Sequence, residues 1–522
     1  MKFLSTFFLF TFFISTSLLA QKKKLGPVNT YRNPVIAGDF ADPSVIRVGD
    51  TYYAAGTSSE WGPAYPIYSS TNLTDWQYLG PVFNEIPAWT MGSFWAPELF
   101  YYKDTYYCYY TARRKSDKQS FIGVATTKDL KKGFTDHGII IEWTSEAIDA
   151  YVVEDKGKLY ITWKAYGLDK GRAIELLGAE LSADGLKVVG KEFTIIKANT
   201  NDWEGGGAEG QSIFKRGKYW YMLYSGNSCC GSKCNYMVGM ARAEKLQGPW
   251  EKYAGNPVLV SDDTWKCPGH GTVVTTPDKR YFYLHHAYSA ADFTFVGRQG
   301  VLSELVWNDK THWPVFRYGS ATPAQAEAPA GTSFANFSGF NLDFAVAQPN
   351  IRWIYDVRQP EPVYAVQDGA LRIENKTPGQ TSNFVGFNLK KSSYTFTADV
   401  VSKNDLTQSI VIYGDADNAL GYGVRGNTVE LWQIKDGTFS TLKTQQIPAQ
   451  QKAITLKLQS HNGRFYEFSW EVKGQKPDAA NKAVQTDTLW LPRWDRAARV
   501  GVNVAGTATG KGEIRALEMK YN

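Results

Sequence analysis

Hydrophobic and polar positions alternate over short runs in the first three hundred residues, and one signature recurs among them. A turn with small or charged residues is followed by aromatic residues that open an apolar run. The aromatic that marks each copy is Tyr52, Tyr106, Tyr160, Tyr219 or Tyr281, so the steps are 54, 54, 59 and 62 residues. Another strand-like run precedes each turn and a third follows it, with almost no helical periodicity. This pattern predicts antiparallel all-β structure in five units of similar size.

Each unit is too small to bury both faces of its own sheet. Units of this kind are expected to pack around an axis as blades, so we predict a five-bladed β-propeller over residues 21–318. A single large β-sandwich is the alternative. It does not explain why the signature repeats.

The repeat also aligns one position in every unit. Ten or eleven residues before each marker aromatic, the first strand of the unit opens with Asp42, Ala96, Asp149, Glu209 or His270. The innermost strands of a propeller run along its axis, so these residues should meet at one mouth of the central channel. Three carboxylates and a histidine at one mouth disfavour each other's charged forms. Such an arrangement indicates a functional site, a bound ion or a partner.

Two chemistries suit three convergent carboxylates. One is glycoside hydrolysis, in which one carboxyl group protonates the leaving oxygen and another activates water or attacks carbon. The other is binding of a hard cation such as calcium. Aromatic residues make up 15% of the chain and include 17 Trp, and aromatic faces stack on sugar rings. This composition favours a sugar-binding site over a cation site. The candidate stacking residues are Trp61, Trp89, Trp95 and Trp203, for each of which core packing is an equal alternative.

Several phrases then resemble one family. They are Asn33-Pro34-Val35-Ile36, Asp39-Phe40-Ala41-Asp42-Pro43-Ser44, Ser58-Ser59-Glu60-Trp61, Trp95-Ala96-Pro97-Glu98, Ile148-Asp149, Glu209-Gly210, Gly269-His270-Gly271 and Gly297-Arg298-Gln299. In order and spacing, from Asn33 to Phe316, the chain resembles glycoside hydrolase family 43, on its arabinofuranosidase and β-xylosidase side. The resemblance implies a five-bladed propeller and hydrolysis that inverts the anomeric centre.

The resemblance also implies a role for each site residue. Asp42 corresponds to the general base, Glu209 to the general acid, and Asp149 to the carboxylate that tunes the pKa of the acid and orients it. His270 corresponds to an axial histidine that binds substrate and in some members contacts calcium directly or through water. Arg298 corresponds to a substrate-side arginine, and Trp61 and Trp95 are expected to contact the sugar.

One departure concerns the acid. Many members of the family carry Glu-Gly-Pro-His at this place, whereas this chain has Glu209-Gly210-Gln211-Ser212 after a Gly-rich approach. Glu204 therefore stays a rival for the role.

Beyond the repeats, residues 319–333 contain no aromatic residue and one charge, which is the composition of a linker. From residue 334 to 522, strands with period-two alternation return, as in residues 394–398 and 454–458. We predict a β-sandwich accessory domain there, similar to the concanavalin-like jelly roll that often follows the family's propeller.

The chain begins with a short basic start, a Phe- and Leu-rich run and a small-residue end. Residues 1–20 are predicted to be a signal peptide cut between Ala20 and Gln21, which implies export to the periplasm or medium with no membrane span. The chain has 57 Lys and Arg against 51 Asp and Glu, a formal net charge of +6. This balance does not indicate a basic patch, and no nucleic acid partner is expected.

Five cysteines are present, an odd number. Cys108 lies in an aromatic run and is interpreted as a buried small apolar residue. Cys229, Cys230, Cys234 and Cys267 are expected to form one or two disulfides or to stay as inert thiols. A metal site is the alternative, although the Cys-Cys-x3-Cys spacing fits no common zinc pattern.

Taken together, the sequence predicts an exported, exo-acting, inverting hydrolase. Its expected substrates are α-L-arabinofuranosyl or β-D-xylosyl units of arabinoxylan, arabinan or derived oligosaccharides. No cofactor is required, and a structural calcium is left open. An endo-arabinanase or galactan-cleaving enzyme of the same family is one alternative. A non-catalytic sugar-binding propeller is another.

Overall fold

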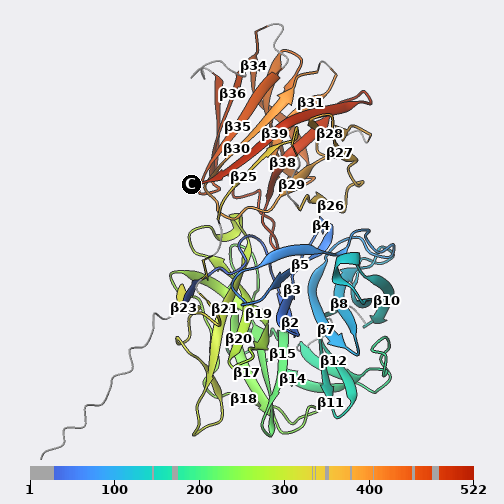
Figure 1. Cartoon of the computed structure of the whole chain (residues 1–522), viewed down its shortest axis with the longest axis vertical. Coiled ribbons are helices and arrows are strands. Elements are labelled where there is room, and N and C mark those ends of the chain that lie inside the picture. The colour runs from blue at the N-terminus through green and yellow to red at the C-terminus, as the bar shows by residue number, and fades with distance from the viewer. Residues whose placement is uncertain are drawn as a thin grey trace, which may run out of the picture.

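The computed structural model describes residues 29–143, 146–166, 174–331, 333–334, 337–346, 352–376, 379–403, 405–448, 453–472 and 481–522. Two bodies, a propeller and a β-sandwich, follow each other along the chain (Figure 1). The predicted signal peptide, residues 1–20, lies outside the described residues. In the described part, no helix is both long and apolar enough to cross a membrane.

Five four-stranded antiparallel sheets form the propeller, as predicted. Blade one comprises β2 (Ser44–Val48), β3 (Thr51–Ala55), β5 (Ala64–Ser70) and β6 (Gln77–Phe83). Blade two comprises β7 (Trp95–Tyr102), β8 (Thr105–Arg113), β9 (Ser120–Thr127) and β10 (Thr135–Ile141). Blade three comprises β11 (Glu146–Asp155), β12 (Lys158–Tyr166), β13 (Glu175–Glu180) and β14 (Phe193–Lys197). Blade four comprises β15 (Glu209–Arg216), β16 (Tyr219–Gly226), β17 (Met237–Ala243) and β18 (Glu251–Lys252). Blade five comprises β19 (Trp265–Thr275), β20 (Tyr281–Ser289), β21 (Arg298–Trp307) and β22 (Pro314–Phe316).

The first strands of the five blades contact one another in a closed ring, β2–β7–β11–β15–β19–β2. Two 3₁₀ turns lie between strands, η1 (Leu130–Lys132) and η2 (Phe293–Phe295). The N-terminal segment lies on blade five, where the hydroxyl of Tyr31 donates to the Leu302 carbonyl at 2.8 Å. The ring brings the starts of the first strands to a common axis.

The repeated aromatics fill the cores between blades, which explains their period. Tyr53 of blade one and Tyr106 of blade two belong to one cluster, with ring centroids 5.8 Å apart. Tyr219 of blade four and Tyr281 of blade five belong to another. A blade without its aromatic pair would leave its neighbour's face exposed, so each unit must carry the signature.

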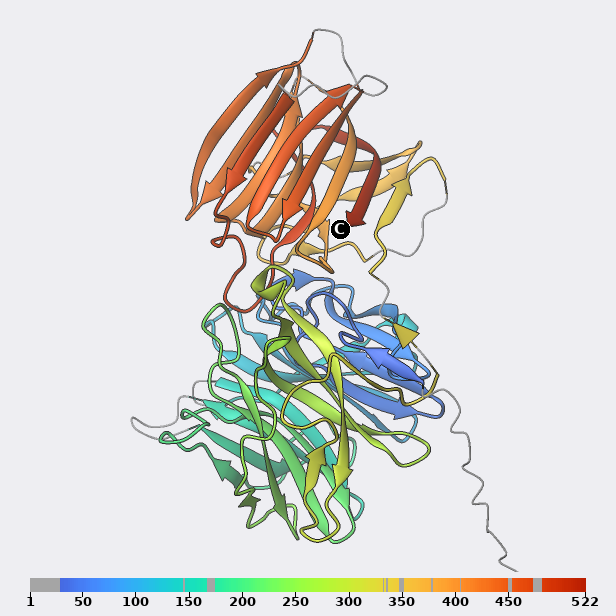
Figure 2. The same cartoon turned by 90° about the vertical axis from the view of Figure 1, so that its left-hand side faces the viewer.

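The C-terminal body is a β-sandwich, and Figure 2 shows its two layers. One sheet contains β25 (Phe340–Asp343), β27 (Tyr364–Gln367), β28 (Ala370–Glu374), β30 (Tyr394–Val401), β35 (Ala453–His461), β36 (Phe465–Val472), β37 (Lys482–Thr486) and β39 (Lys511–Tyr521). The other contains β29 (Val385–Phe387), β31 (Thr407–Asp415), β32 (Asn418–Arg425), β33 (Thr428–Lys435), β34 (Thr438–Gln446) and β38 (Arg499–Ala505). Along β30 every second side chain is buried, as the alternation predicted.

The stretch expected to be a linker, residues 319–333, is attached to the propeller along part of its length. Strand β23 (Gln325–Glu327) pairs antiparallel with β1 (Thr30–Arg32), and β24 (Ser333–Phe334) pairs with β1 in parallel. Ala326 and Ala328 are buried there. Small residues in this stretch therefore allow close packing as well as turns.

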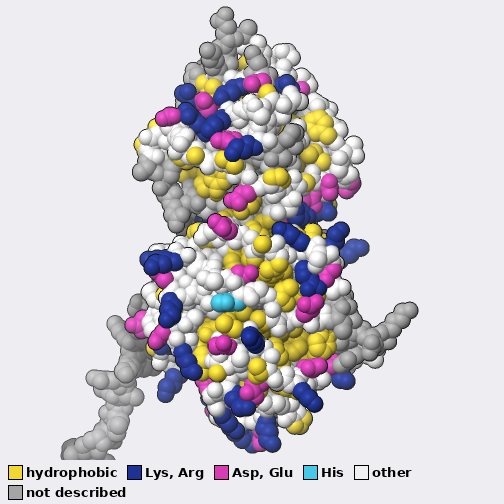
Figure 3. Space-filling view, turned by 90° about the vertical axis from the view of Figure 1, so that its right-hand side faces the viewer, with side chains coloured by type: hydrophobic (Ala, Val, Ile, Leu, Met, Phe, Trp, Pro, Cys, Tyr) yellow, Lys and Arg dark blue, Asp and Glu magenta, His cyan; other side chains and the backbone are white. Residues whose placement is uncertain are grey.

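The two bodies are joined by a strand pair. Strand β4 (Trp61–Gly62) of the propeller pairs with β26 (Tyr355–Asp356). Asp39 adds an ion pair to the junction, since its Oδ2 lies 3.0 Å from Nη2 of Arg499. On the face shown in Figure 3, charged side chains of both signs are interspersed with hydrophobic ones over both bodies.

Candidate active site

A cavity of about 380 Å³ lies at the mouth of the channel where the first strands begin. Most of its lining comes from the propeller, and two residues come from a loop of the β-sandwich. The lining residues are Asp42, Trp95, Arg113, Glu146, Ile148, Asp149, Lys164, Glu209, Cys229, Cys230, His270, Arg298, Trp494 and Asp495. The structure thus brings together every residue to which the family resemblance gave a role, except Trp61.

The backbone at the cavity has an unusual conformation that repeats from blade to blade. One residue of each blade has a positive φ near the start of its first strand: Asp42 (51°), Ala96 (41°), Asp149 (59°), Gly210 (61°) and His270 (34°). Four of the five are not glycine, and such left-handed residues are costly unless the surroundings hold them. In blade four the equivalent position is Gly210, so Glu209 lies one residue earlier than the sequence alignment of the repeats placed it.

A side chain of the preceding blade holds four of these residues by accepting a hydrogen bond from the backbone N–H. The acceptors are Oγ1 of Thr57 for Ala96 (2.8 Å), Oγ1 of Thr111 for Asp149 (3.2 Å), Oγ of Ser225 for His270 (2.9 Å) and Nδ1 of His286 for Asp42 (3.1 Å). Each acceptor lies five or six residues after a marker aromatic. This second periodic position was not predicted, although its spacing can be read from the sequence.

Asp42 is buried among cationic and hydrogen-bonding groups. Its Oδ1 lies 3.0 Å from Nη1 of Arg298 and 3.5 Å from Nδ1 of His270. The hydroxyl of Thr57 donates to its Oδ2 at 2.6 Å. Burial by itself raises the pKa of Asp42, but Arg298, His270 and His286 outweigh it and hold the pKa below its ordinary value. The carboxylate is therefore charged over the ordinary pH range.

Glu209 is held from two sides. The hydroxyl of Tyr236 donates to its Oε1 at 2.6 Å, and the ammonium group of Lys164 donates to its Oε2. Burial opposes ionisation of Glu209, yet Lys164, Tyr236 and His270 together keep its pKa below the ordinary value. Without substrate, this carboxyl is stabilised as the anion.

Asp149 shows the opposite shift. Its Oδ2 lies 3.8 Å from Nδ1 of His270. Burial, together with the nearby charge of Glu209, raises the pKa of Asp149 to about 6 even though His270 opposes the shift. The role of Asp149 in tuning the acid stays a prediction; in the free protein Lys164, Tyr236 and His270 outweigh burial and keep the pKa of Glu209 below its ordinary value. Of the two carboxyl groups, Asp149 therefore has the higher pKa.

Lys164 was not found from the sequence. It lies in β12 between Trp163 and Ala165, after Tyr160, Ile161 and Thr162, so it is the one charged residue in a run of uncharged side chains. A lysine inside such a strand could have indicated a neighbouring carboxylate, because a buried lysine needs an anionic partner.

The β-sandwich completes the wall of the cavity. Nη2 of Arg298 donates to the backbone carbonyl of Asp495 at 3.0 Å. The indole N–H of Trp95 donates to Oδ2 of Asp495 at 3.3 Å, and the rings of Trp95 and Trp494 lie 6.0 Å apart. No pattern in the sequence indicated that this loop reaches the catalytic mouth.

The prediction that Trp61 contacts the sugar is wrong in this structure. Its side chain is 1% exposed and does not line the cavity. It packs against Tyr413 with ring centroids 5.7 Å apart, and the guanidinium of Arg499 lies 4.9 Å from its ring. Because β4 pairs with β26, the indole is enclosed by the β-sandwich and cannot stack on a sugar.

Three other candidates also lie outside the lining. Trp89 stacks on Tyr110, and Trp203 packs on Tyr224. Glu204, the rival for the acid, is fully buried against Lys252 and accepts a hydrogen bond from Tyr224 at 2.6 Å. Glu204 therefore has buried structural partners away from the cavity, whereas Glu209 lines the cavity.

The calcium expectation rested on His270. In the described part of the chain, no three His, Cys, Asp or Glu side chains form a group that could hold a metal ion. The calcium contact expected at His270 stays a prediction.

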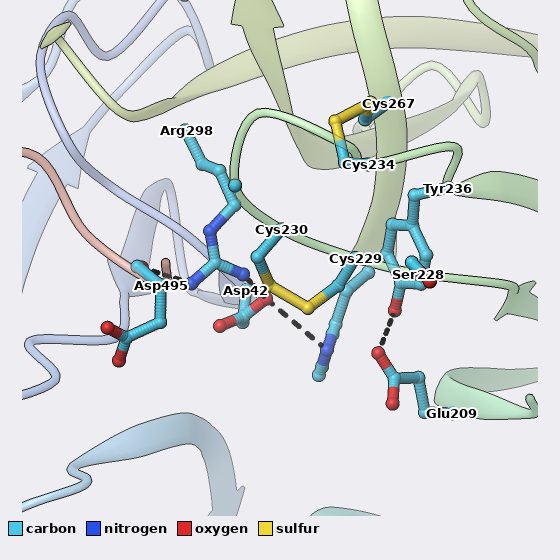
Figure 4. Close-up of a disulfide and its surroundings, with 12 residues drawn as sticks. Asp42, Glu209, Ser228, Cys229, Cys230, Cys234, Tyr236, Cys267, Arg298 and Asp495 are labelled. Carbon is cyan, nitrogen blue, oxygen red and sulfur yellow. Dashed lines mark hydrogen bonds and ion pairs between the residues drawn. A yellow bond between two sulfur atoms is a disulfide. The ribbon is translucent and has the colours of Figure 1, made fainter. Parts of the chain in front are cut away.

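The cysteines form two disulfides, Cys229–Cys230 and Cys234–Cys267. Cys108 is free and buried, as interpreted from the sequence. In Figure 4 the Cys229–Cys230 bridge lies between Asp42 and Glu209 in the view. The sequence left open whether these four cysteines form disulfides, stay as thiols or bind a metal. In this structure they form two disulfides.

Comparison with known proteins agrees with this geometry. The profile of the family described as "Glycosyl hydrolases family 43" matches residues 31–314, slightly more than half of the chain. Among curated relatives, the "Beta-xylosidase" of Formosa agariphila is 27% identical over 317 residues, which is 55% of this chain and 50% of the relative. The "Extracellular exo-alpha-(1->5)-L-arabinofuranosidase ArbA" of Cellvibrio japonicus is 28% identical over 308 residues, 53% of this chain and 86% of the relative. The chain thus spans about half the length of the first of these.

Solved structures share the fold over both bodies. The GH43 protein BlXynB of Bacillus licheniformis superposes with a TM-score of 0.81 at 20% identity, covering 94% of this chain and 100% of that one. The xylan beta-1,4-xylosidase of Bacillus halodurans superposes with a TM-score of 0.80 at 19% identity, with the same coverage. The predicted all-β fold, a propeller followed by a β-sandwich, is confirmed.

Proposed function

The chain belongs to glycosyl hydrolases family 43, and from that premise we propose that it is an exported, exo-acting, inverting hydrolase of α-L-arabinofuranosyl or β-D-xylosyl units. The observation that carries this proposal is the meeting of Asp42, Asp149 and Glu209 in one cavity. Their different surroundings push their pKa values apart, as an acid–base pair of carboxyl groups requires.

Asp42 is the proposed base. Because Arg298 and His270 favour its anion, it can take a proton from a water molecule next to the anomeric carbon. The oxygen of that water forms the new bond to carbon as the glycosidic bond breaks. Attack on the face opposite the leaving group inverts the anomeric centre.

Glu209 is the proposed acid, and it delivers a proton to the departing glycosidic oxygen. In the free protein Asp149 has the higher pKa of the pair, about 6, so below that pH the proton of the pair is on Asp149. Entry of the sugar displaces water and weakens the advantage of the Glu209 anion, so the proton can pass to Glu209 before bond cleavage. After turnover Asp42 carries the proton from water and the pair has lost one, and exchange with solvent restores both.

The exo preference is supported by the shape of the cavity. Trp494 and Asp495 of the β-sandwich form a wall on one side of the cavity. A pocket suits a terminal sugar unit, whereas an internal unit of a polymer needs room on both sides. One relative is named "Extracellular endo-alpha-(1->5)-L-arabinanase 1", which supports the endo-acting alternative.

The test is a panel of nitrophenyl glycosides of α-L-arabinofuranose, β-D-xylose and galactose, together with linear arabinan. We expect release of nitrophenol from the arabinofuranoside or xyloside and monosaccharide as the first product from polymer. The anomer released first, followed by NMR, should be inverted. Oligosaccharides as first products would favour the endo alternative, and sugar binding without turnover would favour a lectin.

Export is part of the proposal. It is supported by the apolar segment within residues 1–20 and by two disulfides, which persist in oxidising compartments. N-terminal sequencing of the mature protein should begin at Gln21.

A further inference from the structure

The loop between β16 and β17 carries three features beside the cavity within ten residues, 227–236. It contains the bridge between adjacent Cys229 and Cys230 and one half of the Cys234–Cys267 bridge. It ends at Tyr236, whose hydroxyl donates to Glu209. The loop therefore belongs to the blade that supplies the proposed acid.

The two bridges differ in their exposure to the cavity. Cys229 and Cys230 are half-buried and line the cavity with the carboxylates, whereas Cys234 and Cys267 do not line it. Cys267 is 2% exposed and packs with Tyr236 and Tyr288. The first bridge thus presents its surface to the occupant of the cavity, and the second anchors the loop.

Most of the residues that line the cavity carry charged or ionisable side chains, and only a few are apolar. Besides the Cys229–Cys230 bridge, apolar surface comes from Trp95, Ile148 and Trp494. Figure 4 shows the bridge between Arg298 and Asp42 on one side and Glu209 on the other in this view. A sugar ring carries an apolar C–H face as well as hydroxyls, so a charged pocket needs some apolar wall to hold that face.

A disulfide between neighbouring residues suits such a wall. Its sulfurs are polarisable and have no proton to donate, so they do not compete for the sugar's hydroxyls. Two free thiols at the same positions would each rotate independently and would donate weakly. The bridge makes one fixed apolar patch out of two small side chains.

The loop that carries the bridge is held in place. The backbone N–H of Gly231 donates to the hydroxyl of Tyr288 at 3.1 Å, and the N–H of Asn235 donates to the carbonyl of Ser228 at 3.1 Å. With the Cys234–Cys267 bridge and the Tyr236–Glu209 hydrogen bond, these contacts set the position of the patch relative to the acid.

We propose that the Cys229–Cys230 disulfide is a substrate-binding wall that contacts the apolar face of the pentosyl unit held between Asp42 and Glu209. The proposal rests on the proposed function for the identity of the sugar. It predicts that tight substrate binding requires this bridge to be oxidised.

The test compares two double variants of the whole protein. C229A/C230A removes the wall, and C234A/C267A removes the bridge that lies outside the cavity and serves as the matched control. Binding of L-arabinose and D-xylose is measured by isothermal titration calorimetry. KM and kcat are measured on the nitrophenyl glycoside that the wild type cleaves, and Tm is recorded for each protein.

In C229A/C230A we expect binding to weaken and KM to rise by about tenfold, because apolar contact with the sugar is lost. Its kcat should change much less, and its Tm should stay close to that of the wild type. C234A/C267A should lose Tm and keep most of its affinity, because the hydrogen bonds of Gly231, Asn235 and Tyr236 still hold the loop in this variant. Equal loss of affinity in both variants, or none in C229A/C230A, would overturn the proposal.

Reduction supplies a second measurement that does not depend on folding of C229A/C230A. Treatment of C234A/C267A with a phosphine reductant should raise its KM to the level of C229A/C230A, and reoxidation should restore it. Alkylation followed by mass spectrometry records which thiols are free. Failure of reduction to change KM or binding while both thiols of the vicinal pair become alkylated would contradict a role for the bridge.

The outcomes separate this proposal from the proposed function. Pentose binding that depends on the bridge in a protein without hydrolytic activity would uphold the wall and refute the enzyme. Hydrolysis that is unaffected in C229A/C230A would uphold the enzyme and refute the wall. Neither hydrolysis nor pentose binding by the wild type would refute both.

Discussion

Arg298 contacts the carboxylate of Asp42 with Nη1 at 3.0 Å, and this ion pair joins the first and last blades of the propeller. The other end of the guanidinium donates to the Asp495 carbonyl in the β-sandwich. The proposed base therefore sits where blade one, blade five and the second body meet. Its low pKa depends on Arg298, His270 and His286 of blade five, which outweigh the effect of burial.

Asp42→Asn should keep the shape of the side chain and remove the proton acceptor. We expect turnover to fall by at least about a hundredfold, because general base catalysis is lost. Circular dichroism and Tm should show a folded protein. Asp50→Asn, in an exposed turn of the same blade, is the control and should retain wild-type activity. An Asp42→Asn variant with more than about a tenth of wild-type turnover would refute the role.

Glu209→Gln should affect substrates according to their leaving groups. Poor alcohol leaving groups need protonation, so their hydrolysis should be nearly lost, whereas activated aryl glycosides should be partly spared. The measurement is kcat/KM on both substrate types. Glu204→Gln should instead lower Tm, because it disrupts the buried contacts with Lys252 and Tyr224. Equal losses on both substrate types in Glu209→Gln would leave the acid unassigned.

Asp149→Asn should move the descending limb of the rate profile to lower pH. In the wild type, the Asp149–Glu209 pair keeps its proton below about pH 6, since burial and then the Glu209 charge raise the pKa of Asp149 to about 6. Activity should therefore fall as pH rises through that value. Without Asp149 the acid has only its own pKa, which Lys164 and Tyr236 hold below the ordinary value despite burial. A limb that stays in place would show that Asp149 does not share the proton of the acid.

Lys164→Met should move the same limb in the other direction. The ammonium group favours the anions of Glu209 and Asp149, so its removal should raise the pKa of both and extend activity to higher pH. Lys158→Met is the matched control, because Lys158 lies in the same strand but pairs with Glu180 at the surface. A shift to lower pH in Lys164→Met would contradict the assigned electrostatics.

Trp61→Ala and Trp95→Ala should separate structural from substrate-binding tryptophans. Trp61 is enclosed between the two bodies, so its truncation should cost about 3–5 kcal/mol of unfolding free energy and change KM little. Trp95 lines the cavity, so its truncation should raise KM with a smaller loss of stability. Chemical denaturation and steady-state kinetics test both. A raised KM with unchanged stability in Trp61→Ala would restore it as a sugar contact.

The sequence by itself determined the number of blades and the end of the channel that carries charge. The reason is that the aromatic period reflects contacts between neighbouring blades, and each blade is a continuous piece of chain. Once the period is known, the left-handed position at the channel mouth is known within one residue in every blade, although the first strands themselves begin up to five residues away from it. This places Asp42, Asp149, Glu209 and His270 at one mouth.

Tertiary structure alone decided how those groups are charged and what closes the cavity over them. Trp95 and Asp495 form a hydrogen bond although they lie 400 residues apart in the sequence. Lys164, which belongs to blade three, donates a hydrogen bond to Glu209 of blade four. Local patterns report which face of a strand is buried, but they do not report which distant segment covers that face. For the same reason Trp61 looked like a sugar contact, although the β-sandwich buries it, and the cysteine pairing depended on how the loop lies beside β19.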